Sequence, residues 1–134
     1  MFKKISYRDL NALQKENYNF HKISAVLADY GFTTLRLSDD WQGADFIAQH
    51  IDGGQFLRVQ LKSRLTFCKK YLGKSLHIAF HGAGRWYLYP HDELFKEIAG
   101  VSNIEKTESW LTKGEYHFPT LSVDHRMILE EFVL

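Results

Sequence analysis

The 134-residue sequence is short of the residues that build disulfide frameworks, zinc sites and flexible linkers. Its single cysteine, Cys68, excludes an internal disulfide and a cysteine-based zinc site, and is typical of a reducing compartment. Only two prolines interrupt the chain, and no repeat, low-complexity tract or Pro/Ser-rich linker is visible. With a hydrophobic fraction of 45%, residues 1–134 are therefore expected to form a single domain around one core.

A long apolar run is also missing. The N-terminus begins with charges but turns polar where a signal peptide would need its apolar segment. No later run approaches the length of a membrane span. These features predict a cytoplasmic protein that is neither exported by such a signal nor embedded in a membrane.

The net charge is only +1, but it is unevenly distributed. Residues 1–91 hold 13 Lys and Arg against 7 Asp and Glu, whereas residues 92–134 hold 4 against 9. Segment 58–74 contains no acidic residue and six basic ones: Arg58, Lys62, Arg64, Lys69, Lys70 and Lys74. Such a segment suits a polyanion, although a run of charge is equally typical of a solvated face.

The first element expected is a helix that starts at Ser6 and stops at Gly31. Ser6 is a capping residue, and Asp9 lies at the capping-box position three residues later. Apolar residues recur every three or four positions along it: Leu10, Leu13, Phe20, Ile23, Leu27 and Tyr30. One face of this helix should therefore be buried.

Strands are expected over 32–37, 43–51, 55–67, 76–80 and 85–89, followed by helices over 90–99, 104–111 and 123–132. Asp52-Gly53-Gly54 is a tight hairpin signal, so the second and third strands should be antiparallel. The order predicts an α/β fold of the α+β type, with a mixed sheet flanked by helices.

Alternation in the third strand places one set of side chains on a polar face: Arg58, Gln60, Lys62 and Arg64. If the hairpin turns through Gly53 and Gly54, Asp45 lies opposite Lys62 and diagonal to Gln60. Such neighbours lie about 4.5–8 Å apart, close enough to share a metal or a water. A slip in register would move these pairs.

Glu16 falls between Leu13 and Phe20, on the stripe that the helix should bury. A buried carboxylate needs a metal ion or a basic partner, because burying an unpaired charge is expensive. The alternatives are that Glu16 lies at the edge of the stripe and reaches solvent, or that it pairs with Lys62. Asn17 is the nearest competitor for its role.

Gly43-Ala44-Asp45-Phe46, the glycine hairpin and Val59-Gln60-Leu61-Lys62 together resemble the signature of PD-(D/E)xK nucleases. The resemblance covers residues 10–90 and extends to the acidic helix and the order of elements. It is closest to the branch in which glutamine replaces the second acid, as in methyl-directed restriction enzymes, some homing endonucleases and relatives of Holliday-junction resolvases. Ala44 and Gln60 depart from the family pattern, and Gln60 removes one negative charge from the metal site.

The resemblance implies a restriction-endonuclease-like core and a magnesium-dependent DNA endonuclease in which manganese can substitute. Its catalytic residues would be Glu16, Asp45, Gln60 and Lys62, and its metal ligands Glu16, Asp45, Gln60 and the Leu61 carbonyl. Carboxylate, amide and carbonyl oxygens are the hard ligands that magnesium takes. DNA phosphates would be held by the remaining basic residues of segment 58–74: Arg58, Arg64, Lys69, Lys70 and Lys74.

Three alternatives remain open: a non-catalytic DNA-binding module of the same fold, a protein-interaction domain that uses the acidic segment 92–134, and an unrelated small α/β domain. A homodimer is expected for the nuclease, because one site cuts one strand.

Aromatic residues also flank the basic segment. Alternation puts Trp86 and Leu88 on one strand face and Tyr87 and Tyr89 on the other, so at most one pair can face outward and stack on bases.

Overall fold

The structure, a computed structural model, describes the whole chain except the side chains of Asp40 and Trp41. Its N-terminal part has one long helix and three strands: η1 (Tyr7–Asp9), α1 (Ala12–Asp29), β1 (Phe32–Trp41), β2 (Ala44–His50) and β3 (Phe56–Leu61). A middle part follows, with β4 (Thr66–Cys68), η2 (Lys69–Tyr71), β5 (Leu76–Gly82) and β6 (Arg85–Pro90). The C-terminal part is mostly helical: α2 (His91–Val101), η3 (Ile104–Lys106), α3 (Glu108–Lys113), β7 (Glu115–His117), α4 (Val123–Leu129) and η4 (Glu130–Phe132).

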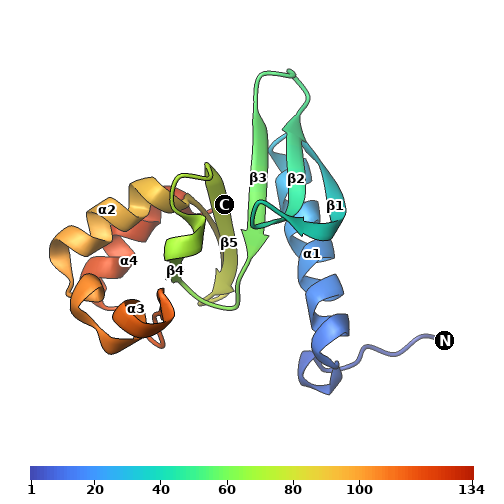
Figure 1. Cartoon of the computed structure of the whole chain (residues 1–134). Coiled ribbons are helices and arrows are strands. Elements are labelled where there is room, and N and C mark those ends of the chain that lie inside the picture. The colour runs from blue at the N-terminus through green and yellow to red at the C-terminus, as the bar shows by residue number, and fades with distance from the viewer.

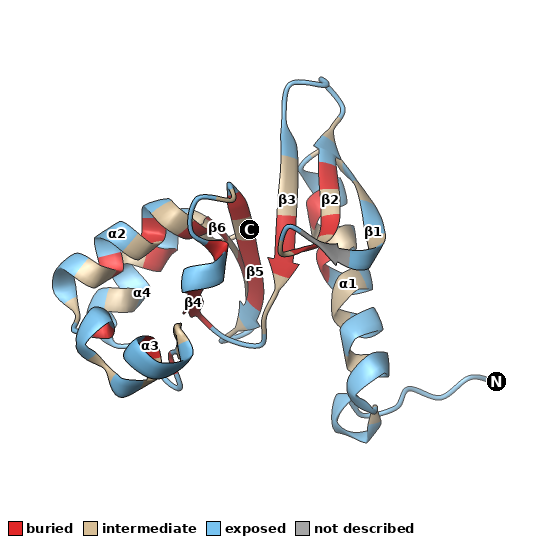
Figure 2. Ribbon diagram, viewed as in Figure 1, coloured by how far each residue is buried: buried red, intermediate tan, exposed pale blue. Residues whose placement is uncertain are grey.

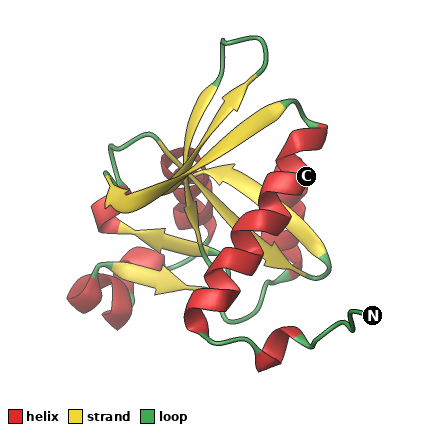
Figure 3. Cartoon of the chain, turned by 90° about the vertical axis from the view of Figure 1, so that its right-hand side faces the viewer, coloured by secondary structure: helices red, strands yellow, loops and turns green.

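Five strands form a mixed sheet in the order β1-β2-β3-β5-β6. Only β3 and β5 pair in parallel, whereas the other neighbours are antiparallel. Figure 1 shows α1 against the β1–β3 part of the sheet and the C-terminal helices on the other side of the molecule. Figure 3 shows α1 crossing the face of the sheet. The predicted α+β fold, a mixed sheet flanked by helices, is therefore confirmed.

The sheet separates two hydrophobic cores, whose buried residues are coloured red in Figure 2. The smaller core packs Ile23 and Leu27 of α1 on Phe46, Ala48 and Val59, and these side chains are fully buried. The larger core lies under α2, α3 and α4, and it is rich in aromatic rings: Phe67, Tyr71, Phe80, Tyr87, Tyr89, Trp110 and Phe118. Both faces of the sheet thus hold apolar side chains.

Helix α1 begins later than predicted. Asn11, not Ser6, caps it, and Gln14 completes the capping box with hydrogen bonds of 2.8 and 2.9 Å between the two residues. The short η1 turn occupies the region where the helix was expected to start. Leu13 is accordingly 63% exposed, and the buried stripe begins only at Phe20.

The predicted strand over 55–67 is two strands in different sheets. β3 ends at Leu61, and β4 pairs with β7, an unpredicted strand, in a separate two-stranded sheet. The four residues 65–68 are all buried, so the chain abandons the alternation of a half-buried strand where β3 ends. β1 is four residues longer than the predicted 32–37, and its register with β2 shifts between Arg36 and Trp41.

The hairpin register was also predicted wrongly, by two residues. Phe46 pairs with Val59, and the His50 N–H donates to the Gln55 carbonyl at 2.9 Å, so the loop spans residues 51–54. Asp52 closes this loop by accepting the Gly54 N–H at 2.8 Å. Because side chains alternate with a period of two, a shift of two residues leaves Asp45, Gln60 and Lys62 on a common face.

The later elements were predicted more closely. β5 and β6 extend one or two residues beyond the predicted ranges, and α2 begins directly after Pro90. The helix expected over 104–111 is divided into η3 and α3, because Thr107 caps a new helix that ends at Gly114 with a positive φ of 71°. Among the described residues, every helix is too short or too polar to serve as a membrane span.

Candidate functional site

Asp45 and Gln60 lie on neighbouring strands, one pair beyond the last regular pair, Phe46 with Val59. Asp45 Oδ2 accepts the Leu61 N–H at 2.8 Å, which ties the carboxylate to the end of β3. Gly43 makes this approach possible. It has a φ of 88°, and a Cβ on it would lie 2.7 Å from Leu76 Cδ1, so a larger residue would displace the start of β2.

Gln60 is 9% exposed, and its Oε1 atom is buried without a hydrogen-bond partner among the described residues. Two other buried side-chain atoms share this property, Nδ1 of His77 and Nδ1 of His125, and neither residue lines the cavity described below. A buried amide oxygen without a partner costs about 1–3 kcal/mol. Such an atom calls for a partner, for example a water or a metal ion.

Lys62 follows directly after β3, where the chain leaves the sheet. Its N–H donates to the Ala79 carbonyl at 2.9 Å and so continues the parallel pairing by one residue. Its Nζ lies 5.5 Å from the centre of the Tyr71 ring. Lys70 Nζ lies 5.4 Å from the same ring, so Tyr71 holds two cations near the end of β3.

One cavity of about 440 Å³ is lined by all the residues that were predicted to be catalytic or to bind metal: Glu16, Asp45, Gln60, Leu61 and Lys62. These residues come from α1, β2 and the end of β3. The structure therefore brings together, at one place, side chains that are 46 positions apart in the sequence from Glu16 to Lys62. Their roles remain predictions.

Glu16 reaches the cavity from an exposed position and not from the buried stripe. Its side chain is 67% exposed, and its Oε2 lies 3.7 Å from Nη2 of Arg36. The expectation that it is buried is wrong, because the first turns of α1 contain no buried residue and the buried stripe begins only beyond Glu16, with Phe20, Ile23 and Leu27. The alternative that Glu16 reaches solvent is confirmed, but its basic partner is Arg36.

Arg36 was missed by the sequence analysis. It lies on β1, lines the same cavity, and donates a hydrogen bond to the side chain of Asn17. Its guanidinium also lies 5.4 Å from the centre of the Phe20 ring. In the sequence, Arg36 is the one charged residue of the predicted strand 32–37. A single arginine in a strand does not by itself indicate a site.

The donor set fits a hard divalent cation. Asp45 supplies a carboxylate, and Gln60 supplies an amide oxygen without a hydrogen-bond partner among the described residues. Magnesium accepts both kinds of oxygen as ligands. Among the described residues there is no cluster of three or more His, Cys, Asp or Glu side chains that suits a metal. A site here would therefore depend on neutral oxygens as well as on carboxylates.

The predicted phosphate-binding residues are divided between separate places. Lys70 and Lys74 line a small cavity of about 240 Å³ beside Gly43, while Arg64 lines another of about 440 Å³ together with Arg126. Lys69 Nζ lies 5.4 Å from a Trp110 ring. Arg58 is partly buried in β3, in register with Ile47 and Leu76. These residues therefore do not share one cavity.

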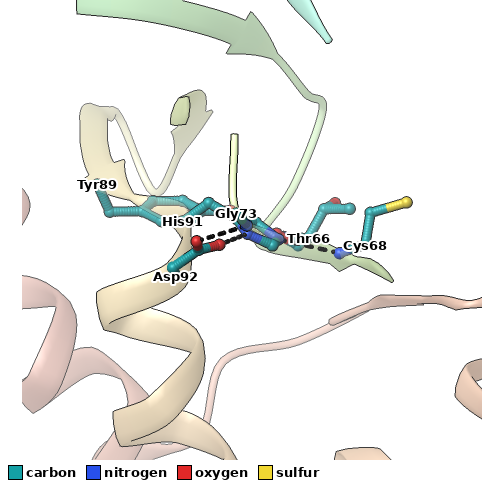
Figure 4. A network of polar contacts seen from close by, with 6 residues as sticks. All are labelled: Thr66, Cys68, Gly73, Tyr89, His91 and Asp92. Atoms are coloured by element: carbon teal, nitrogen blue, oxygen red, sulfur yellow. Dashed lines mark hydrogen bonds and ion pairs between the residues drawn. The ribbon is translucent and has the colours of Figure 1, made fainter. Parts of the chain in front are cut away.

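A second polar cluster, shown in Figure 4, holds the segment after β3 in place. The Tyr89 hydroxyl donates to the Thr66 carbonyl at 2.7 Å and accepts the Thr66 N–H at 3.1 Å. His91 Nε2 accepts the Cys68 N–H at 3.0 Å, so the ring proton is on Nδ1 and is donated to Asp92 Oδ1 at 2.9 Å. Asp92 Oδ2 accepts the Gly73 N–H at 2.8 Å. We call these residues the paired cluster.

Burial shapes the protonation of the paired cluster. It lowers the pKa of His91, although Asp92 opposes the shift, and it raises the pKa of Tyr89. Both side chains are therefore neutral near pH 7. This supports a local hydrogen-bonding role for His91 and gives no support to a metal site.

No family model matches this chain, and no curated protein matches it. Among solved structures, the structure of this chain is similar to the structure of Hjc, a Holliday junction resolvase from the archaeal hyperthermophile Archaeoglobus fulgidus. The similarity covers 52% of this chain and 74% of that chain, with 14% sequence identity and a TM-score of 0.42.

Proposed function

We propose that the protein is a metal-dependent DNA endonuclease that hydrolyses phosphodiester bonds. One observation carries the proposal: Asp45, Gln60, Leu61 and Lys62 line one cavity with Glu16. The buried amide oxygen of Gln60, which has no hydrogen-bond partner among the described residues, supports it, because such an atom calls for a partner such as a metal ion or a water.

Asp45, the Gln60 amide oxygen and the Leu61 carbonyl would hold a magnesium ion, with Glu16 at its edge. A bound magnesium ion lowers the pKa of an attacking water and neutralises charge on the scissile phosphate. Asp45 keeps one oxygen on the Leu61 N–H, so its carboxylate orientation is fixed before any ligand arrives. This preorganisation avoids reorienting the carboxylate on binding.

Lys62 would act on the phosphate directly. It lines the cavity two residues after Gln60, and a cation in that position would stabilise the negative charge that develops on the phosphorane. It can also orient the attacking water. Lys70, which shares the Tyr71 ring with Lys62, would bind a neighbouring phosphate and fix the position of the strand without reading its sequence.

Glu16 and Arg36 would tune the mouth of the cavity. Arg36 balances the charge of Glu16 at 3.7 Å in the absence of DNA. When a phosphate enters, Arg36 could bind it, and the Glu16 carboxylate could then accept a hydrogen bond from a water in the cavity. The exposure of both side chains leaves them free to rearrange at small cost.

The test is an incubation of purified protein with supercoiled, linear and branched DNA in magnesium, in manganese and in EDTA. We expect nicking that requires the metal and that Lys62→Met lowers by about a hundredfold or more, as the loss of a single stabilising charge does. Lys106→Met removes a lysine from η3, far along the chain from the cavity residues, and should leave the rate unchanged.

Absence of cleavage in every metal, with DNA binding that weakens as salt rises, would replace the proposal with a non-catalytic DNA-binding module. Absence of both activities would favour the protein-interaction domain. We also propose a homodimer, since two sites are needed to cut both strands. Light scattering that gives a strict monomer with duplex-cutting activity would contradict the dimer.

A further inference from the structure

A second cavity, of about 540 Å³, adjoins the cavity of the candidate site. The two share four lining residues: Tyr7, Asn19, Lys62 and Ser63. Lys62 therefore lies at the boundary between them.

The wall of the second cavity is aromatic. It includes Tyr7 from η1, Tyr18 from α1 and Trp86 from β6, beside His81. The Tyr7 and Tyr18 ring centres lie 5.2 Å apart, and those of His81 and Trp86 also lie 5.2 Å apart. Tyr18 is 41% exposed, so its ring is not buried in the hydrophobic core. These rings offer flat apolar surfaces to a ligand.

The same cavity carries positive charge. Lys22 and Lys62 line it, and none of the described residues that line it is acidic. Lys22 Nζ lies 5.2 Å from the centre of the Tyr18 ring, which places a cation beside an aromatic surface. A flat ring attached to a negative charge, the chemistry of a nucleotide, matches this combination.

A third cavity adjoins the second. It shares Ser63 and His81 with the second cavity and adds Arg64 and Arg126. The three cavities meet at Ser63, just after β3, and each has a cation in its lining: Lys62 in the first, Lys22 in the second and Arg64 in the third. These cations suit a ligand that carries several phosphates.

We propose that the second cavity binds an unpaired nucleotide next to the phosphate at the candidate site, with its base on Tyr18 and Trp86 and its phosphate near Lys22. The inference rests on the proposed function and narrows its substrate to DNA with a single-stranded portion. A base inside a duplex is stacked on both faces and does not reach such a cavity. The unpaired nucleotide of a flap, gap or open junction does.

The experiment compares two ligands of equal charge. In EDTA, which prevents cleavage, fluorescence anisotropy measures binding of a labelled oligothymidylate and of an abasic sugar-phosphate strand of the same length. We expect the wild type to prefer the thymidylate by about five- to a hundredfold, the range of stacking one base on an aromatic side chain. Equal affinities of the wild type for both strands would overturn the proposal.

Variants locate the preference. Tyr18→Ala should remove most of it and Tyr18→Phe should keep it, because the ring and not the hydroxyl binds the base. Tyr30→Ala is the matched control, since Tyr30 is an exposed tyrosine at the other end of the same helix. A preference that Tyr18→Ala leaves intact, or that Tyr30→Ala removes equally, would contradict the assignment of this cavity.

Photocrosslinking gives a second readout that does not depend on a variant. A 5-iodouracil strand should crosslink to Tyr18 or Trp86, and crosslinks confined to other residues would overturn the proposal. Base-dependent binding at Tyr18 without any cleavage would keep the nucleotide site and reject the nuclease. Metal-dependent cleavage without base-dependent binding would keep the nuclease and reject the nucleotide site.

Discussion

The molecule has two polar clusters beside its main sheet, and they differ in whether their groups are paired. In the paired cluster, the buried Tyr89 and His91 make hydrogen bonds to the backbone of Thr66 and Cys68. In the candidate site, Gln60 Oε1 is buried with no partner, and Glu16 is mostly exposed. A fully paired buried cluster holds a fold together, whereas an incomplete one beside a cavity is where a ligand completes the pairing.

The two clusters also stand in different surroundings. The paired cluster is attached to the larger aromatic core, while the candidate site lies at the end of β3 near the smaller core under α1. Removing a group from the first should therefore cost stability. Removing a group from the second should cost activity and little or no stability. The four predictions below test this difference, from the largest expected change in stability to the smallest.

Tyr89→Phe should lower the free energy of unfolding by about 1–3 kcal/mol. The hydroxyl serves both the N–H and the carbonyl of Thr66, and its loss leaves both groups buried without a partner. Urea unfolding measures the change. Tyr116→Phe is the control, because Tyr116 is partly buried and its hydroxyl does not bond both backbone groups of another described residue. A loss below about 0.5 kcal/mol would mean that the paired cluster is not structural.

Stability should fall as the pH drops below about 6.5, the ordinary pKa of histidine. Burial lowers the pKa of His91 and of His77 in the folded state, so the unfolded chain takes up protons first. The stabilisation is complete above the ordinary pKa and is lost as the pH falls toward the lowered value. Thermal unfolding between pH 8 and 5 measures the loss.

His91→Gln should flatten that pH dependence, because it removes one of the two titrating groups while keeping an oxygen that can accept the Cys68 N–H. His21→Gln changes an exposed histidine and should leave the pH dependence as it is in the wild type. An unchanged slope in His91→Gln would contradict the assignment of the effect to the paired cluster.

Gln60→Met should leave the free energy of unfolding unchanged or raise it by about 1 kcal/mol, since it removes a buried amide that has no partner for its oxygen. Metal-dependent cleavage should fall at the same time. Gln49→Met, at an exposed glutamine on β2, is the matched control and should change neither quantity. A clear loss of stability in Gln60→Met would show that Gln60 is structural.

Glu16→Gln should change stability by less than about 1 kcal/mol, because its ion pair with Arg36 is exposed. Cleavage should weaken, since Glu16 lines the cavity with Asp45 and Lys62. Asn17→Ala is the neighbouring control, and a larger loss of cleavage in that variant would transfer the role to Asn17. Circular dichroism melting and initial nicking rates provide the two readouts.

Much of the fold follows from local patterns in the sequence. The apolar spacing of Phe20, Ile23 and Leu27 predicts the buried side of α1, and the glycines after Asp52 predict the hairpin. The hairpin register was missed by two residues, because Asp52 closes a loop of four residues and not of two. The shared face of Asp45, Gln60 and Lys62 survives this error, since two residues are one full period of a strand.

Other features depend on contacts that are distant in sequence. β4 and β7 are three residues each and form only because 66–68 and 115–117 meet in space, so neither has a pattern of its own. Arg36 reaches Glu16 from β1, which no spacing along the chain indicates. The unpaired oxygen of Gln60 is likewise a property of packing, and it is the observation that separates this cavity from the paired cluster.

The most direct test of the account is one nicking experiment in magnesium with three proteins: the wild type, Asp45→Asn and Gln60→Glu. Asp45→Asn keeps an oxygen for the Leu61 N–H but removes the charge, and Gln60→Glu adds a carboxylate beside Asp45. We predict that Asp45→Asn loses about a hundredfold or more in rate while Gln60→Glu remains active. Nicking by Asp45→Asn at the wild-type rate would contradict the proposed site.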